Sequence, residues 1–126
     1  MGESLASDFL IAKSYKILYR NYSMPRWGEI DIIALDKDEI VFVEVKTRTN
    51  NNYGDPLDAI TPHKLKSLRR TINYFLTHEG REYLDRPYRI DAISILVDAK
   101  NKTIISKDQV SMLSWYPFAW RLKAFA

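Results

Sequence analysis

Residues 28–48 read GEIDIIALDKDEIVFVEVKTR and carry the clearest structural pattern in the chain. Two runs rich in Ile and Val lie on either side of the polar pair Lys37 and Asp38. Apolar, β-branched runs that are separated by a short polar turn are typical of two antiparallel strands. The sequence therefore predicts strands over residues 28–36 and 39–48, joined by a tight turn.

The turn also predicts how the two strands are paired. If it is centred on residues 37–38, residues at equal distances from it face each other, so Asp31 faces Glu44 and Glu29 faces Lys46. Side chains alternate along a strand, so these four lie on one face. The other face carries only apolar side chains, and we expect it to be buried: Ile30, Ile32, Ala34, Val41, Val43 and Val45.

The facing acids suggest a metal site. Asp31 and Glu44 lie between apolar residues on a largely covered hairpin, where unpartnered carboxylates are costly to desolvate. A Mg²⁺ or Mn²⁺ ion bound by their oxygens would remove that cost and leave room for water and a phosphate oxygen. Lys46 could then hold the attacking water or offset charge on the phosphate. The alternative is a surface network in which Lys46 pairs with Glu29 and Glu44.

The rest of the chain alternates between helices and strands. Thr61 and Pro62 have the residue types preferred at the cap and first position of a helix. The order α-β-β-β-α-β predicts an α/β fold, a mixed sheet flanked by helices, in a single domain over residues 1–126. The further elements that we expect are a helix at 3–13, a strand at 15–19, loops at 21–26 and 49–55, a helix from 61 through 76, strands at 88–97 and 103–106, and a helix or cap over 109–126.

Composition excludes several classes of protein. The chain has 126 residues, of which 46% are hydrophobic and 28% charged, as in ordinary globular domains. It has no cysteine, which excludes disulfides, thiolate zinc sites and a cysteine nucleophile and suits the cytoplasm. No apolar run is long enough for a membrane span, and residues 1–8 do not resemble a secretory signal. The net charge of +3 is a weak indication of an anionic partner.

The two strands resemble the PD-(D/E)xK nuclease signature, with Asp31 followed by Glu44-Val45-Lys46. More closely, the chain is similar to the YraN-type family of small bacterial proteins, which are related to archaeal Holliday-junction resolvases. Ile30 stands where the signature has Pro, and Ser14 where the family usually has Gly. The other matching pieces are Gly2-Glu3, Ala6, Tyr15, Arg20-Asn21, Gly54, Pro56, Ala59-Ile60, Lys64 and Arg89-Ile90-Asp91.

The resemblance implies a restriction-endonuclease-like fold and a Mg²⁺- or Mn²⁺-dependent DNA nuclease, acting on branched or junction DNA and forming a homodimer. It implies that Glu3, near the start of a helix, joins Asp31 and Glu44 at the metal, although Glu3 could equally favour the helix dipole. Glu29 is a candidate catalytic helper. Two alternatives stay open: a non-catalytic nucleic-acid-binding module that keeps the nuclease fold, and a metal-stabilised structural domain.

Basic residues of the second helix indicate where nucleic acid would bind. Lys66, Arg69 and Arg70 lie away from its apolar stripe and could follow phosphates, with Lys64 beside them. A solvated helix face is the alternative, and Lys64 could face the catalytic pocket instead. Arg48 shares the face of Glu44 and Lys46, so we expect it either to contact substrate or to form a salt bridge.

Overall fold

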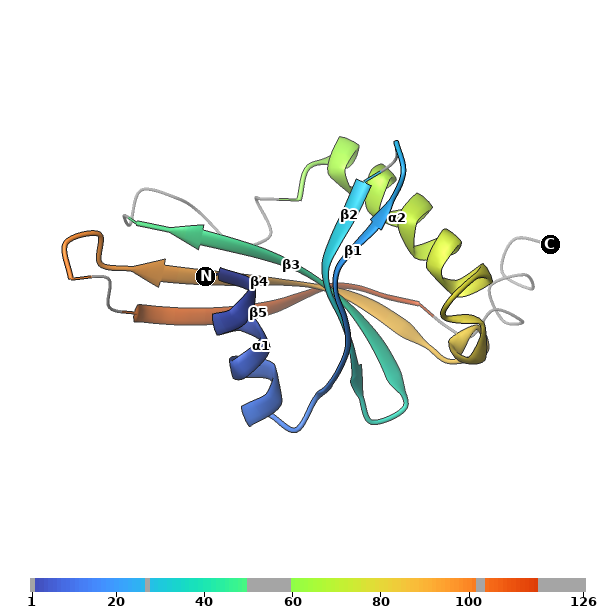
Figure 1. Ribbon diagram of the computed structural model, residues 1–126, viewed down its shortest axis with the longest axis horizontal. Coiled ribbons are helices and arrows are strands. Elements are labelled where there is room, and N and C mark those ends of the chain that lie inside the picture. Colours follow the sequence, from blue (N-terminus) through green and yellow to red (C-terminus); the bar gives the residue numbers. More distant parts are fainter. Residues whose placement is uncertain (1, 27, 50–59, 102–103, 116–126) are drawn as a thin grey trace.

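The computed structural model describes residues 2–26, 28–49, 60–101 and 104–115 (Figure 1). In chain order its elements are α1 (Gly2–Ala12), β1 (Lys16–Met24), β2 (Gly28–Asp36), β3 (Glu39–Arg48), α2 (Pro62–Thr77), the 3-10 helix η2 (Arg81–Tyr83), β4 (Tyr88–Val97) and β5 (Ile104–Trp115). Most of the expected loop at 49–55 and residues 116–126 of the expected C-terminal cap lie outside the described residues.

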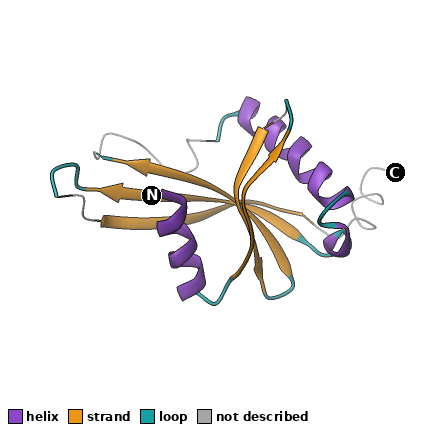
Figure 2. Ribbon diagram, in the orientation of Figure 1, coloured by secondary structure: helices purple, strands orange, loops and turns teal. Residues whose placement is uncertain are grey.

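The five strands form one mixed sheet in the order β1-β2-β3-β4-β5. Neighbouring strands are antiparallel except β3 and β4, which are parallel and are separated in the chain by α2. A parallel pair needs such a crossover because the chain must return to the same end of the sheet. The predicted α/β architecture, a restriction-endonuclease-like mixed sheet flanked by helices, is confirmed (Figure 2).

Alternating residues of the central strands supply two hydrophobic cores, one on each face of the sheet. Ile33 and Phe42 pack with residues of α2, including Phe75. Ile32 and Val43 pack with residues of α1. The sheet is thus covered by α2 on one face and α1 on the other. No helix in the described part of the chain is long and apolar enough to cross a membrane.

The strand register agrees with the prediction near the turn and departs from it further along. Pairing runs from Asp36↔Glu39 to Ile32↔Val43, as expected, and the β2–β3 ladder ends there. The expected pairing of Glu29 with Lys46 is therefore wrong, and the expected Asp31–Glu44 pair also lies just past the end of this ladder. Ile30 was also expected on the face of Ile32, but it packs in the core beneath α2.

Both edge strands are longer than predicted. β1 continues through residues 21–24, where we expected a loop, and β5 continues through residues 109–115, where we expected a helix or cap. Asn21 has a positive φ of 53°, and β1 also changes register between Ile17 and Tyr19, so the strand does not show a regular alternation. In β5 the polar run 106–109 interrupts the apolar residues, so the sequence does not show the alternation that would have predicted a long strand.

Candidate active site

The strands β2 and β3 separate at Asp31, and the side chain of this residue bridges the gap. Its Oδ2 accepts a hydrogen bond of 2.7 Å from the backbone N–H of Val45 on β3. Beyond this point the start of β2 stays with β1, while the end of β3 stays with β4 up to Arg48 (Figure 1). The carboxylate thus takes a backbone donor at the place where the ladder ends.

Glu44 lies one residue past the last β2–β3 pair and is mostly buried. Its side chain is 12% exposed, and its Oε1 is 2.7 Å from Nζ of Lys64, which is 43% exposed. Its Oε2 is buried without a hydrogen-bond partner in the described part of the structure. A buried carboxylate oxygen that lacks a donor is costly, so this atom suits a cation or an ordered water.

The environment of Asp31 disfavours its charged form. Burial is the largest effect, and it raises the pKa of Asp31 from the ordinary 3.8 to about 6. The hydrogen bond from Val45 opposes this rise, while the negative charges of Glu44 and Glu3 add to it. Titratable groups with strongly shifted pKa values cluster at functional sites, and bringing a cation to Asp31 would reverse the shift.

Lys64 joins the acids from the first turn of α2. Its hydrogen bond to Glu44 raises its pKa against the opposing effect of burial, and the charges of Glu44, Asp31 and Glu29 raise it further. The Thr61 side chain caps α2 by accepting a hydrogen bond of 3.1 Å from the backbone N–H of Lys64. The predicted cap therefore also fixes the residue that reaches Glu44.

Glu3 approaches the site from α1. Gly2 allows this, because a Cβ at Gly2 would lie 2.4 Å from the Oγ1 of Thr47 on β3. The start of α1 can pack this closely on the strand only without a side chain at that position. Glu3 acts on the pKa of Asp31 through its charge, as noted above.

The donor set fits a divalent ion that keeps several of its waters. Within the described ranges, no three Asp, Glu, His or Cys side chains gather closely enough to enclose a metal. Mg²⁺ commonly binds through one or two carboxylates together with water and substrate phosphate, rather than in an all-protein cage. Asp31 and Glu44 match this pattern, and Glu3 does not join them in a closed set of three ligands.

Lys46 and Ser94 share the face of Glu44 on adjacent strands. The pairs Glu44↔Ala92 and Lys46↔Ser94 belong to one parallel ladder, so these side chains point the same way. Lys46 is exposed, whereas the Oγ of Ser94 is buried without a hydrogen-bond partner among the described residues. Ser94 was not among the predicted site residues, although its place two residues after Ala92 on the strand at 88–97 puts it on this face.

The basic residues expected to bind nucleic acid separate into groups. Lys66, Arg69 and Arg70 are exposed on α2, as predicted. Lys64 instead joins the carboxylates, which was the alternative given for it. Arg48 is half-buried at the end of β3. The alternative to a metal site was a surface network of Lys46 with Glu29 and Glu44. In the described part of the chain, Glu44 forms its ion pair with Lys64 instead.

Comparison with known proteins agrees with the resemblance seen in the sequence. Residues 2–95 match the model of Uncharacterised protein family UPF0102. A UPF0102 protein of Prosthecochloris aestuarii is 44% identical over 101 residues, which cover 80% of this chain and 77% of that protein. One from Syntrophomonas wolfei is 42% identical over 102 residues, covering 80% and 86%. With most of its length matched, this chain belongs to the UPF0102 family, the YraN-type family that its motifs resemble.

Proposed function

We propose that this protein is a Mg²⁺- or Mn²⁺-dependent nuclease that hydrolyses DNA phosphodiester bonds, with branched or junction DNA among its substrates. The observation that carries the proposal is the pair of acids where β2 and β3 separate. Asp31 has a raised pKa of about 6, and Glu44 has a buried oxygen without a hydrogen-bond partner in the described part. Both features are unfavourable in the protein alone and are relieved by a bound cation.

Asp31 and Glu44 would hold the metal, which when bound polarises the phosphodiester and lowers the pKa of an attacking water. The Val45 N–H fixes the carboxylate of Asp31 through a 2.7 Å hydrogen bond. Lys46 is exposed on the same face as Glu44 and is placed to offset negative charge on the phosphate. Hydrolysis adds water to the phosphorus and breaks one of its bonds to a sugar oxygen.

The test is cleavage of labelled linear duplex, single-stranded and four-way-junction DNA in Mg²⁺, in Mn²⁺ and in EDTA. We expect metal-dependent cutting, with Asp31→Ala and Glu44→Ala each slower by at least about 100-fold. Asp85→Ala removes an exposed carboxylate outside the site and is the matched control, with the rate of the unaltered protein. Cutting in EDTA, or undiminished cutting by Asp31→Ala, would refute the proposed site.

One observation favours a second candidate, a nucleic-acid-binding module without catalysis. The ion pair between Lys64 and Glu44 already neutralises one of the two acids without a metal. In that case the same assay shows no cleavage of any DNA form, while binding persists in EDTA and weakens as salt rises.

A further inference from the structure

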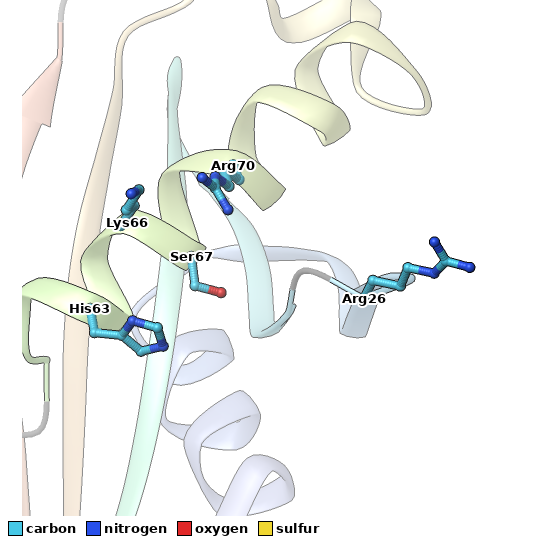
Figure 3. A pocket seen from close by; sticks show the side chains of 5 residues that line it. All are labelled: Arg26, His63, Lys66, Ser67 and Arg70. Carbon is cyan, nitrogen blue, oxygen red and sulfur yellow. The ribbon is translucent and has the colours of Figure 1, made fainter.

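A polar cavity lies between the β1–β2 turn and the outer flank of α2 (Figure 3). It has a volume of about 270 Å³ and is lined by Arg26, His63, Lys66, Ser67 and Arg70. Arg26 belongs to the β1–β2 turn, and the other four belong to the first half of α2. The lining contains three permanent cations, an imidazole and a hydroxyl, and no acid.

The backbone around this cavity requires a glycine at the start of β2. Gly28 has a φ of +144°, and a Cβ there would lie 2.5 Å from the Oγ of Ser67. The turn therefore lies directly on α2, and a larger residue would push the two apart. Thr71 Oγ1 donates a hydrogen bond of 3.0 Å to the carbonyl of Ser67, which holds the helix side of this contact.

Polar side chains of α2 line the cavity, but their ends point in different directions, and in Figure 3 Lys66 points away from the Ser67 hydroxyl. In Figure 3 the Ser67 hydroxyl and the His63 ring point toward the space beside α2, and Arg70 reaches toward Ser67. The guanidinium of Arg26 points outward, so the stem of this exposed side chain lines the cavity. An anion in the cavity would contact hydrogen-bond donors on the helix side. The exposed side chain of Arg26 is long enough to rotate and bring its guanidinium to the same anion.

We propose that this cavity is a phosphate-binding subsite for the nucleic-acid strand that is cut at Asp31 and Glu44. Arginine, lysine and hydroxyl donors together are typical of phosphate recognition. The identity of the strand rests on the proposed function, whereas the affinity of the cavity for phosphate does not. The subsite involves Arg26 and His63, which extends the predicted basic face of α2 across to the β1–β2 turn.

The position of the cavity sets its place along the strand. Gly28, at the wall of the cavity, and Asp31 are three residues apart on β2, or about 10 Å at the rise of an extended chain. At this distance the phosphate in the cavity is within a few nucleotides of the bond that is cut.

The subsite is tested by the salt dependence of DNA binding in EDTA, followed by fluorescence anisotropy with a labelled oligonucleotide. We expect Lys66→Gln and Arg70→Gln each to reduce the slope of log K against log salt by about 0.7 to 0.9, the value of one phosphate contact. Arg81→Gln is the matched control, because Arg81 is exposed, lies beyond α2 and loses the same charge. Its slope should equal that of the unaltered protein.

Several outcomes would overturn the subsite. The first is an unchanged salt-dependence slope in both Lys66→Gln and Arg70→Gln. The second is an equal reduction of the slope in Arg81→Gln, which would indicate a diffuse effect of net charge. If the cavity binds inorganic phosphate but the slopes for DNA binding are unchanged, its ligand is free phosphate and not a phosphate of the DNA backbone. Circular dichroism confirms that each variant is folded.

This experiment also separates the subsite from the proposed function, because EDTA removes any metal. If the unaltered protein cuts no DNA but the cavity variants show a smaller salt-dependence slope, the phosphate subsite is supported and the proposed nuclease activity is refuted. If the protein cuts DNA and the cavity variants have the same slope as the unaltered protein, the nuclease activity is supported and the subsite is refuted.

Discussion

Asp31 is held where its charge is unfavourable. Burial and two neighbouring acids raise its pKa to about 6, while the hydrogen bond from Val45 and the charge of Lys64 oppose this rise. Glu44 beside it keeps one buried oxygen without a hydrogen-bond partner in the described structure. Proteins retain such local instability mainly at functional sites, where a ligand relieves it. Without metal, we therefore expect the charged form of Asp31 to lower the free energy of unfolding.

We predict that Asp31→Asn stabilises the metal-free protein above pH 6. The folded protein binds the Asp31 proton more tightly than the unfolded chain, because the pKa is about 6 rather than 3.8. The free energy of unfolding therefore falls as pH rises from about 4 to about 6, and stays lower above that. The loss is at most about 3 kcal/mol, since one pKa unit equals about 1.4 kcal/mol and solvent screens a half-buried group.

The measurement is urea denaturation in EDTA between pH 4 and pH 8. Asn at position 31 can still accept the hydrogen bond from Val45, so Asp31→Asn should lack the fall and match the unaltered protein near pH 4. Asp85→Asn, at an exposed site, serves as control and should follow the unaltered protein throughout. If Asp31→Asn were less stable at pH 8, the carboxylate would be favourably paired instead.

We also predict that Lys64→Met strengthens Mn²⁺ binding by at least about fivefold, a typical coupling between ligands that compete for one site. The ammonium lies 2.7 Å from Glu44 and competes with a cation for that oxygen. Lys66→Met is the matched control, because it removes the same charge from the same helix without touching Glu44. Calorimetric titration in buffer free of other divalent ions measures both. Equal or weaker binding by Lys64→Met would show that this lysine does not oppose the metal.

The sequence predicted Asp31 and Glu44 as the acids of the site, but not the ion pair of Lys64 with Glu44. Lys46 was the partner of Glu44 in the alternative network, and Lys64 was given only as a residue that could face the pocket. Lys64 is twenty residues further along the chain than Glu44, and only the packing of α2 over the sheet brings it to Glu44. A contact that depends on helix placement leaves no local pattern in the sequence.

At the scale of elements, β2, β3 and β4 were predicted to the residue. Their long runs of Ile and Val, with turn residues at their ends, give a strong strand signal. The separation of β2 from β3 beyond Ile32↔Val43 was not predicted. Continuous alternation suggests an unbroken ladder, whereas the Asp31 side chain takes the donor of Val45 at that point. The same polar residue therefore makes the site and ends the pairing.

Gly28 connects the start of β2 with α2, and we predict that Gly28→Ala destabilises the protein by about 1–3 kcal/mol. Its φ of +144° is strained for any residue with a side chain, and the added Cβ would meet Ser67 Oγ at 2.5 Å. The double variant Gly28→Ala with Ser67→Ala removes the collision but not the strained φ, so it should recover only part of the loss. Thermal or urea denaturation measures both. Full recovery would mean that the backbone strain is negligible.

Across the whole molecule, one mostly buried arginine joins the strands at the end where the β2–β3 turn lies. Arg89 on β4 makes ion pairs with Asp36, Glu39 and the fully buried Asp91. It also donates a hydrogen bond to the hydroxyl of Tyr15, just before β1. The turn, β4 and the segment before β1 are thereby connected, and the sheet is held together away from the place where β2 and β3 separate.

We predict that Arg89→Met costs about 3–5 kcal/mol of stability, because it leaves buried and half-buried carboxylates without their cation. Arg81→Met, at an exposed position, is the control and should change stability by less than about 0.5 kcal/mol. Urea denaturation at pH 7 measures both. A loss below about 1 kcal/mol would show that water replaces the arginine, and that the network adds little to the fold.

The central claim is that Asp31 and Glu44 together hold a divalent ion, and titration with Mn²⁺ followed by electron paramagnetic resonance tests it most directly. We expect saturable binding of a single ion in the unaltered protein, loss of that binding in Glu44→Gln, and unchanged binding in Glu82→Gln, which alters an exposed acid. If the unaltered protein binds no Mn²⁺, or if Glu44→Gln binds it equally well, the account of this site is contradicted.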